Sequence, residues 1–527
     1  MDVTTSLRTD DPPLLAASTA NRLVEQVVAE SGAHRRDVRS PRDGRLVGSV
    51  PLSTPQDVHR AFDRARVAQR GWAERPVRER SRVLMAFHDL VVQRREEALD
   101  IIQWENGKVR AEALDEVLDV ANNARYYARS AASLLRPRRT GTPMPGVLGA
   151  VEVRHPVGVV GVITPWNYPL TLAASDSIPA LLAGNAVVLK PDLQTPFSAL
   201  WAADLLREAG LPSALYSVVL GDGPVIGPEV VDRADYVMFT GSTRVGREVA
   251  VRAADRLVGC SLELGGKNSF VVLDDADPVK AADGAVRSCF AAAGQLCVGT
   301  ERVLVHERIW DDFVPEFLRR TDGLRLSTVD AWGADMGPLI SAKQLASVQR
   351  HVDSAVDAGA TVLAGGKPRP DVGPYFFEPT VLTDVPNDAA VWCEETFGPV
   401  VTLRRFSTED EAVQLANDTA YGLNASVWSR DLPRARRLAE RILVGTVGIN
   451  EGYKAPWTVV DAPMGGMKAS GLARRHGPDG LLKYTEPQTV AWMRGMNYGR
   501  PSWMSDEAMG KVLLGIATTL RRIPGRR

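Results

Sequence analysis

The chain has 527 residues, too many for one hydrophobic core, so two or three domains are expected. Hydrophobic residues make up 45% of it and charged residues 24%, which is the balance of an ordinary globular protein. Since 63 Lys and Arg residues nearly cancel 64 Asp and Glu residues, the charge gives no indication of nucleic-acid binding or of a solvating acidic tail. The four cysteines lack the spacing of a disulfide framework or a zinc site, so no metal is predicted.

The N-terminal sequence MDVTTSLRTDDPPLL lacks the basic start and the apolar core of a secretory signal. No apolar run approaches the roughly 18 residues that a membrane-spanning helix needs. The expected compartment is therefore a reducing cytoplasm.

Residues 57–135 are predicted to be helical because they contain long stretches without Gly or Pro. The sequence LRPRRTGTPMPGVLG, rich in Pro and Gly, then predicts a loop. Beyond it, helical segments at 171–184 and at SALWAADLLREAG alternate with apolar segments, which are VVGVIT, AVVLKP, YSVVLG and YVMFTGS. A second alternating region runs from SFVVLDDAD to about residue 450. Such alternation is typical of βαβ units, so the sequence predicts two α/β domains with parallel sheets.

Cys297 stands in the small-residue sequence FAAAGQLCVGT, near the middle of the chain. A cysteine there could be a buried packing residue, a metal ligand or a nucleophile. Most free cysteines are small core residues, so the residue by itself favours packing.

Two segments lie at the ends of predicted strands, and one carries a lysine whereas the other carries two glycines. Ligands of parallel sheets bind at such strand ends. Lys190 ends the strand AVVLKP and could bind a ribose hydroxyl or a phosphate, or could cap the strand against solvent. Gly241 and Gly246 bracket a turn that opens a helix with Ser242 in its first turn. A helix N-terminus suits a phosphate, although an ordinary strand–turn–helix is about equally consistent with this pattern.

Two further polar residues stand in segments that restrict them. Glu263 lies between apolar residues in SLELGGKNSF, where its pKa should be raised as a general base requires, or where it could form a salt bridge at a domain junction. Asn167 lies between two prolines in TPWNYP, where its amide could donate to an oxyanion or satisfy a local turn.

The segments TPWNYP, KP, FTGST, ELGGKN, GQLC, EETFGPV and APMGGMKASG, in this order, resemble the aldehyde dehydrogenase superfamily over roughly residues 40–492. The resemblance implies an α/β aldehyde dehydrogenase fold with a Rossmann-like cofactor domain, an α/β catalytic domain and a β-hairpin arm that pairs subunits into homodimers or homotetramers. The implied limits are 1–136 and 157–263 for the cofactor domain, 264–450 for the catalytic domain, 137–156 and 481–494 for the arm, and 495–527 for a C-terminal tail.

The same resemblance implies roles for individual residues. Cys297 would attack the aldehyde as a thiolate, Asn167 would hold the oxyanion, and Glu263 would activate the water that hydrolyses the thioester. Residues near the dinucleotide cofactor would be Trp166, Lys190, Asp192, Leu193, Gly241, Ser242, Gly246, Leu264, Glu395 and Phe397.

Leu193 bears on the choice of coenzyme. NAD-preferring members of the superfamily usually carry a Glu three residues after the lysine that aligns with Lys190. Without that carboxylate, a 2′-phosphate meets no direct repulsion and Lys190 is free to pair with it, although Asp192 acts in the opposite sense. NADP is therefore expected as the preferred cofactor, with use of NAD as well.

The segments GVVGVITPWNYPLTLAASDSIPALLAGNAVVLKPD, KPRPDVGPYFFEPTVL and PMGGMKASGLARRHGPDGLLKYTE resemble, within the superfamily, the actinobacterial branch named succinate-semialdehyde dehydrogenase (NADP+). Better-studied succinate-semialdehyde enzymes hold the substrate carboxylate with two arginines and a serine, which are replaced here by Ser175, Ala291 and Val459. An apolar pocket for medium-chain or aromatic aldehydes is the alternative. Should succinate semialdehyde be the preferred substrate, Lys454 is the first residue to examine as the missing cation. The expected pocket residues are Tyr168, Leu172, Ser175, Leu296, Val298 and Trp457.

Two other functions on this fold are less consistent with the sequence. A CoA-acylating dehydrogenase generally lacks the deacylating glutamate that Glu263 supplies. A non-catalytic relative has no need of Cys297, Glu263 and Asn167 together.

The C-terminal tail carries apolar residues at helical spacing, followed by the basic sequence RRIPGRR. Such a helix can rest weakly on an anionic membrane. Packing on the chain's own surface or on a partner subunit is favoured, because apolar stripes usually mark packing. The apolar residues are Met509, Val512, Leu513, Ile516 and Leu520.

Overall fold

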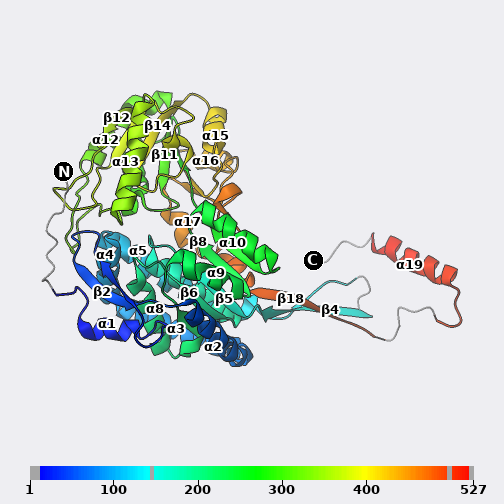
Figure 1. Cartoon of the computed structure of the whole chain (residues 1–527). Coiled ribbons are helices and arrows are strands. Elements are labelled where there is room, and N and C mark those ends of the chain that lie inside the picture. Colours follow the sequence, from blue (N-terminus) through cyan, green and yellow to red (C-terminus); the bar gives the residue numbers. More distant parts are fainter. Residues whose placement is uncertain (1–11, 143–146, 495–500, 522–527) are drawn as a thin grey trace.

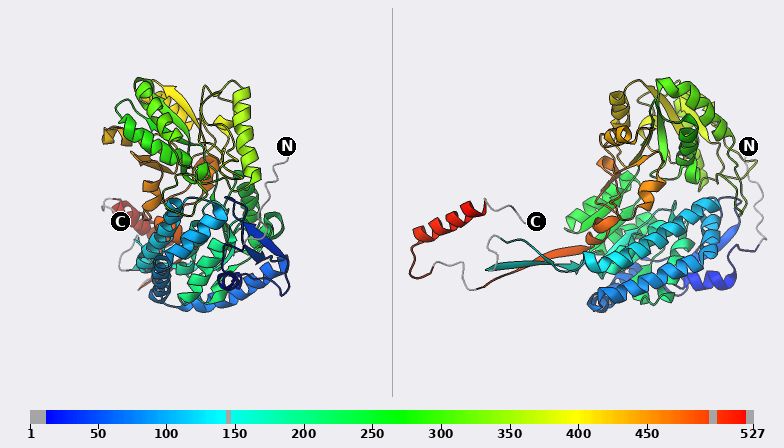
Figure 2. Two further views of the ribbon diagram at one scale, coloured as in Figure 1. Left: turned by 90° about the vertical axis from the view of Figure 1, so that its left-hand side faces the viewer. Right: turned by 180° about the vertical axis from the view of Figure 1, so that it is seen from behind.

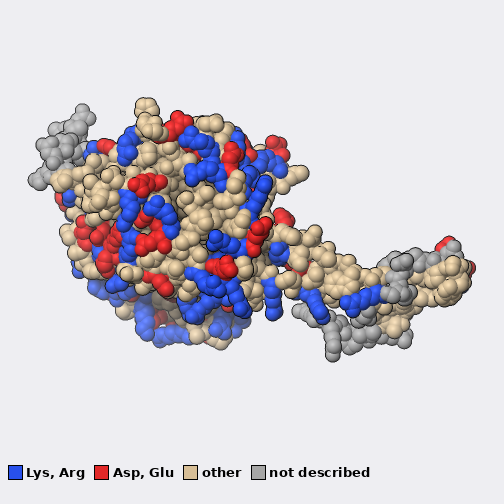
Figure 3. Space-filling view, turned by 90° about the horizontal axis from the view of Figure 1, so that it is seen from below, with Lys and Arg blue, Asp and Glu red and all other residues tan. Residues whose placement is uncertain are grey.

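The computed structural model describes residues 12–142, 147–494 and 501–521. Two α/β bodies lie one above the other, and a thin β arm extends from the lower body and leads toward the terminal helix (Figure 1). Seen from below, basic and acidic side chains are intermixed over the body, as the balanced composition predicts (Figure 3).

The lower body begins with a helical layer that confirms the helical prediction for residues 57–135. Thr54 and Asp57 form a reciprocal capping box at the start of the first long helix. A short antiparallel hairpin precedes this layer. The elements are α1 (Ala17–Val24), β1 (Arg35–Arg39), β2 (Leu46–Pro51), α2 (Pro55–Glu74), α3 (Val77–Gln93), α4 (Arg95–Asn106) and α5 (Arg110–Leu134).

A six-stranded sheet forms the core of the lower body, and all its pairings except that of β17 with β9 are parallel. Its central strands are buried throughout because helices cover both faces. The strand order is β17 (Gly471–Leu472), β9 (Gly259–Glu263), β8 (Tyr236–Thr240), β5 (Val159–Ile163), β6 (Ala186–Lys190) and β7 (Tyr216–Val218). The connecting helices are α6 (Pro169–Ala174), α7 (Ser177–Ala183), α8 (Pro196–Glu208), η1 (Ser213–Leu215), α9 (Gly223–Arg233), α10 (Thr243–Asp255) and α18 (Gly477–Leu482).

The helix predicted at 171–184 is instead two helices, α6 and α7, which meet at Ser175 and Asp176. Pro179 lies in the first turn of α7 and has no N–H to donate to the carbonyl of Ser175. This break fixes the position of Ser175.

A seven-stranded sheet forms the core of the upper body, and β12 is its one antiparallel member. Its order is β12 (Thr361–Ala364), β13 (Thr380–Thr383), β14 (Val400–Phe406), β11 (Thr300–His306), β10 (Asn268–Val272), β15 (Asn424–Trp428) and β16 (Thr446–Ile449), so β16 is an edge strand. Its helices are α11 (Pro278–Phe290), η2 (Ala291–Gly294), η3 (Glu307–Ile309), α12 (Trp310–Asp322), α13 (Ala342–Asp357), α14 (Ala390–Cys393), α15 (Glu409–Asn417), α16 (Leu432–Ala439), α17 (Lys454–Thr458) and η4 (Lys468–Ser470).

The arm consists of β18 (Thr485–Met493), which pairs along its whole length with β4 (Leu148–Pro156), and of β3 (Arg138–Arg139). It stands away from both bodies in the views from the front and from behind (Figures 1 and 2). The terminal helix α19 (Asp506–Leu520) has no buried residue and is capped by Ser505. Among the described residues, none of the helices combines the length and hydrophobicity needed to cross a membrane.

Candidate active site

Cys297 lies in the loop between η2 and β11 with its side chain half-buried. The carbonyl oxygen of Cys297 accepts a hydrogen bond of 2.7 Å from Asn268 Nδ2, and the same amide group also bonds to the carbonyl of Gly299. A Cβ atom at Gly266 would lie 2.5 Å from the Cys297 carbonyl oxygen, so only glycine fits there. The loop that carries the thiol is therefore fixed by its neighbours.

The backbone just before Cys297 is strained. Ala292 and Ala293 have φ angles of 49° and 55°, in the left-handed region that disfavours side chains. Glu112 Oε1 accepts a 2.6 Å hydrogen bond from the Ala292 N–H, which helps to hold this conformation. Backbone strain of this kind persists where the surroundings enforce it, and it is concentrated at functional sites.

Asn167 meets the cysteine loop from the lower body. Its Nδ2 donates to the carbonyl of Gln295 at 3.0 Å, and Lys108 Nζ donates to the Asn167 carbonyl at 2.7 Å. Within the described residues, the backbone N–H of Cys297 donates to no other group. An amide with one N–H still free and a backbone N–H can together stabilise an oxyanion beside the thiol.

Burial and the carboxylates of Glu395 and Glu263 raise the pKa of the Cys297 thiol to about 12, against an opposing effect of Arg475. The thiol is therefore protonated at neutral pH. The carboxyl group of Glu263 is buried at the end of β9. Burial raises the pKa of Glu263 to about 7 although Arg475 and Lys483 lower it, as its apolar surroundings predict. Glu263 is thus able to bind and release a proton near neutral pH.

The carboxyl ends of β5, β6 and β8 form an edge with unsatisfied polar groups. Thr164 and Thr240 carry buried hydroxyls that have no partner among the described residues. Lys190 Nζ donates to the carbonyl of Pro191 at 3.1 Å, and burial lowers the pKa of Lys190. Ligands of open α/β sheets bind at such an edge, and these groups fit the hydroxyls and phosphates of a dinucleotide.

The glycines near α10 serve the packing of the chain. A Cβ atom at Gly246 would lie 2.4 Å from Leu264 Cδ2, so glycine lets α10 pack on the segment after β9. The Gly241 N–H donates to the Glu263 carbonyl at 3.0 Å, and Ser242 caps α10. The Gly241 N–H is therefore already bonded. The N–H groups that remain free at the start of α10 belong to residues that follow Gly241.

A buried ion pair supports the segment that carries Glu395 and Phe397. Glu301 pairs with Lys267 and accepts hydrogen bonds from the Thr396 and Phe397 N–H groups. Phe397 has a φ angle of 54°, a conformation that these bonds hold in place.

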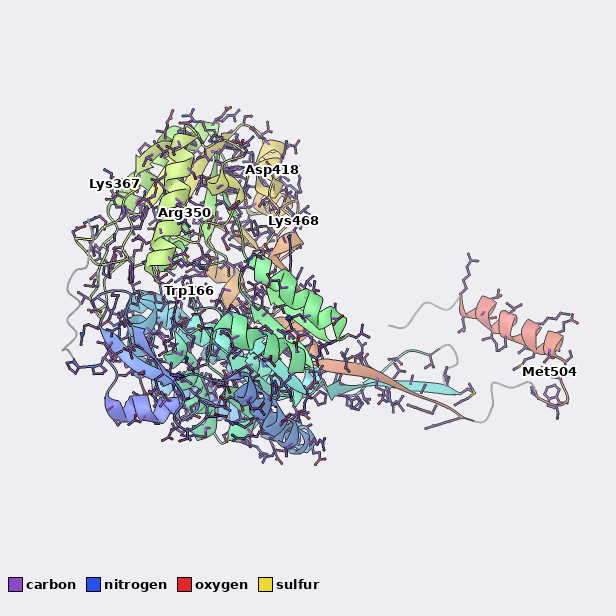
Figure 4. The ribbon with its side chains drawn as sticks, in the orientation of Figure 1. Trp166, Arg350, Lys367, Asp418, Lys468 and Met504 are labelled. Carbon is purple, nitrogen blue, oxygen red and sulfur yellow. The ribbon has the colours of Figure 1, made fainter. Side chains whose placement is uncertain are left out.

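Glu395 is brought beside the cysteine loop by this segment. Its Oε1 accepts from the Gly266 N–H at 2.9 Å, and burial together with Glu301 raises the pKa of Glu395 to about 8. The rings of Phe397 and Trp166 meet edge to face, with centroids 5.5 Å apart. Trp166 lies where the two bodies meet, below Arg350 and Lys367 of the upper body (Figure 4).

The residues expected to select the coenzyme lie after β6. Asp192 Oδ1 accepts a 2.9 Å hydrogen bond from the Gln194 N–H, so this carboxylate is turned toward its own loop. The Leu193 side chain is buried. Asp222 is a second carboxylate near Lys190, and it pairs with Arg36 at 3.2 Å, which the sequence did not indicate.

The profile described as "Aldehyde dehydrogenase family" matches residues 27–490, which carry both sheets and all the residues above. The chain belongs to the aldehyde dehydrogenase family. It is an NAD(P)-dependent oxidoreductase that acts on aldehydes.

Known aldehyde dehydrogenases match the chain over most of its length. A Mycobacterium ulcerans protein named provisionally as succinate-semialdehyde dehydrogenase (NADP+) 2 is 50% identical over 92% of this chain and 93% of its own. The crystal structure of succinate-semialdehyde dehydrogenase from Burkholderia pseudomallei is 37% identical with a TM-score of 0.84, over 89% of this chain and 97% of that one. Betaine aldehyde dehydrogenase from Staphylococcus aureus, in complex with NAD+, is 32% identical with a TM-score of 0.85, over 93% of this chain and 99% of that one.

Most of the expected pocket residues of this aldehyde dehydrogenase form one apolar cluster, against which Cys297 packs. Ser175 does not belong to it, because it is buried and donates to Asp119 Oδ2 at 2.6 Å. Of the three positions that lack clamp residues, Ala291 lies in the cluster, whereas the Val459 side chain is 51% exposed. The members from the expected pocket are Tyr168, Leu172, Leu296, Val298 and Trp457.

The sequence did not indicate a row of buried carboxylates on α5. Glu112 bonds to Ala292, Glu116 accepts from the Leu170 and Thr171 N–H groups, and Asp119 accepts from Ser175. Their spacing of four and three residues places them on one helix face and was the signal available in the sequence.

Arg475 and His476 were also missed. His476 is buried, and within the described residues both of its ring nitrogens lack partners. It adopts a φ angle of 62° in the turn that leads into α18. Arg475 is buried, pairs with Asp176 at 3.2 Å and lies over the Trp457 ring.

Proposed function

We propose that this aldehyde dehydrogenase oxidises uncharged, largely apolar aldehydes through a thioester on Cys297, with NADP as the preferred cofactor. The observation that carries this proposal is the apolar cluster against which Cys297 packs. Aromatic and aliphatic groups in this cluster can hold a hydrophobic chain or ring, and they offer a carboxylate no cation.

The proposed reaction begins when the Cys297 thiol loses its proton to solvent and attacks the aldehyde carbon. The resulting oxyanion accepts hydrogen bonds from the Asn167 amide and the Cys297 N–H. NADP, when bound, would supply the acceptor for the hydride, and Lys190 and Glu395 would hold its ribose groups. Glu263 then takes a proton from water as that water attacks the thioester, which releases the acid and frees the thiolate. A base at this position supports hydrolysis over transfer to CoA.

The name of the mycobacterial relative suggests succinate semialdehyde as the substrate. Within the described part of the chain, the cations near the cluster are each paired: Lys454 with Asp115 at 2.7 Å, Lys108 with Glu116 at 2.6 Å and Arg475 with Asp176 at 3.2 Å. An unpaired carboxylate in an apolar pocket costs several kcal/mol. This charge pattern supports an uncharged substrate.

Hexanal and benzaldehyde are expected to give kcat/KM values at least about tenfold higher than that of succinate semialdehyde, since about 1.4 kcal/mol corresponds to a factor of ten. The measurement is a comparison of initial rates of cofactor reduction at saturating NADP. If succinate semialdehyde is preferred by tenfold or more, the proposed substrate class is wrong, and Arg475 is then the cation to test first.

Leu193→Glu is expected to shift the ratio of kcat/KM for NADP to that for NAD toward NAD by roughly tenfold to a hundredfold. A carboxylate there would accept hydrogen bonds from both ribose hydroxyls and repel a 2′-phosphate, and a hydrogen bond to a charged group contributes about 1.5–3 kcal/mol. Leu193→Gln, of similar size and uncharged, is the matched control and should shift the ratio much less. An unchanged ratio in Leu193→Glu would assign coenzyme choice to other residues, such as Arg36.

The arm is proposed to pair subunits into a homodimer or homotetramer. Val490 and Trp492 on β18 are 45% and 39% exposed, and a long exposed apolar strand at a sheet edge is a surface that other chains bind. A hollow of about 1460 Å³ beside Asn450, just after the edge strand β16, offers room for a partner's arm. We propose that α19 packs on the assembled dimer rather than on a membrane.

Val490→Asp combined with Trp492→Asp is expected to convert the assembly into single chains, because it places charges on the apolar edge of the arm. Light scattering coupled to size-exclusion chromatography measures this. A variant that keeps the wild-type mass would show that subunits pair elsewhere.

A further inference from the structure

A pocket of about 90 Å³ lies beside the apolar cluster, between α5 and α17. Three of its lining residues, Tyr168, Tyr453 and Trp457, also belong to the cluster against which Cys297 packs. If the cluster is the path of the aldehyde, as proposed above, this pocket receives the end of the substrate that is remote from the reacting carbon.

Asp119 lines this pocket and is only 4% exposed. Its Oδ2 accepts a 2.6 Å hydrogen bond from Ser175 Oγ, and its Oδ1 accepts one of 3.1 Å from Asn123 Nδ2. Burial raises the pKa of Asp119 to about 6, so the group is largely ionised at neutral pH. The pocket therefore has a fixed negative charge in its wall.

Thr171 provides an independent sign that the pocket binds a polar group. The residue lines the same pocket and has no solvent exposure, yet its Oγ1 has no hydrogen-bond partner within the described part of the chain. A buried hydroxyl without a partner costs free energy unless a ligand or water satisfies it. A hydroxyl group in the pocket would give this oxygen a partner.

The cations near the pocket offset the charge of Asp119 only in part. Lys454 at the mouth is paired with Asp115, which also lines the pocket. The single guanidinium of Arg475 interacts with three carboxylates, Asp176, Glu263 and Asp119. A carboxylate entering the pocket would meet Asp119 without an unpaired cation beside it.

We propose that Asp119 and Thr171 form a specificity subsite for the remote end of the aldehyde, which accepts an uncharged hydrogen-bond donor such as a hydroxyl group and rejects a carboxylate. This inference rests on the proposed function, and it names the residues that would select the substrate class proposed for the enzyme. Ser175 takes part by holding Asp119 in place.

Three aromatic aldehydes of one shape test the subsite: benzaldehyde, 4-(hydroxymethyl)benzaldehyde and 4-formylbenzoate, each at saturating NADP. For the wild type, kcat/KM is expected to be highest for the hydroxymethyl compound and lowest for 4-formylbenzoate. Asp119→Asn keeps the size of the side chain and removes its charge, so it should raise kcat/KM for 4-formylbenzoate relative to benzaldehyde by about tenfold or more, because like charges in contact cost several kcal/mol.

Thr171→Val is nearly isosteric and removes the unpartnered hydroxyl. It should lower the preference for the hydroxymethyl compound over benzaldehyde by about threefold to tenfold, the effect of one hydrogen bond. This variant keeps the inference testable if Asp119→Asn fails to fold, which its melting curve would reveal.

Glu105→Gln is the matched control, because Glu105 is also a buried carboxylate but bonds to the Phe197 and Ser198 N–H groups at the start of α8, away from the pocket. It should leave both substrate ratios within about twofold of the wild type. Unchanged ratios in both Asp119→Asn and Thr171→Val would overturn the subsite. A wild type that favours 4-formylbenzoate would instead overturn the proposed function, so the two failures are distinguishable.

Discussion

Cys297→Ala is expected to lower kcat/KM for any aldehyde by at least about 10⁴-fold, since removal of a nucleophile that acts with its neighbours costs several orders of magnitude. The substitution deletes one sulfur atom, and the loop around it is held by hydrogen bonds from the side-chain amides of Asn268 and Asn424 to its backbone carbonyls rather than by the thiol. NADP binding, measured by quenching of tryptophan fluorescence, should therefore remain within a few-fold of the wild type.

Cys289→Ala is the matched control for the loss of a thiol near the site. Cys289 is buried in α11, where it packs in the core of the upper body. Its replacement should lower the melting temperature slightly and retain most of the activity. Substantial turnover in Cys297→Ala, or the loss of turnover in Cys289→Ala with intact folding, would contradict the assignment of the nucleophile.

The residues that follow strands could be predicted from the sequence because parallel sheets bring strand ends to one edge. Lys190 ends the buried strand β6, and Glu263 ends the partly buried strand β9 of the same sheet. The alternation of apolar and helical segments likewise predicted both sheets. The short strand β17 could not be predicted, since two residues carry no periodicity and its partner β9 lies about 200 residues earlier.

The carboxylates of α5 could not be assigned from the sequence, because each acts on a loop far away along the chain. Glu112 reaches Ala292, 180 positions later, and Asp119 reaches Ser175, 56 positions later. Acidic residues at helical spacing usually face solvent, so their pattern alone indicates an exposed face. This face is buried because α5 packs against α6 and η2. The sequence pattern does not show that packing.

The assignment of substrate illustrates the same limit. The sequence identified the absent clamp residues at Ser175, Ala291 and Val459, and it pointed to Lys454 as the cation to examine. The structure pairs Lys454 with Asp115 and brings Arg475 behind Trp457 instead. A charged side chain that reaches the site from a turn far along the chain can be identified only once the fold is known.

Glu263→Gln is expected to release one equivalent of reduced cofactor per active site in a rapid burst and then to turn over about 10²- to 10⁴-fold more slowly than the wild type, the usual contribution of a general base. The substitution removes a negative charge that raises the pKa of the Cys297 thiol, so formation of the thiolate and of the thioester is not impaired. Hydrolysis of the thioester is impaired, because no group remains to take the proton from water. Stopped-flow absorbance of the reduced cofactor measures both phases.

The pH dependence of the wild type provides a second check on Glu263. Burial raises the pKa of this carboxyl to about 7, so its basic form is lost as the pH falls through 7. Where hydrolysis limits turnover, kcat should fall about tenfold per pH unit below 7 and level off above it, and Glu263→Gln should lack this inflection. Glu105→Gln, which alters another buried carboxyl with a raised pKa, should keep the inflection. Normal turnover in Glu263→Gln would exclude Glu263 as the base for hydrolysis. The absence of a burst would show that its role is not confined to hydrolysis.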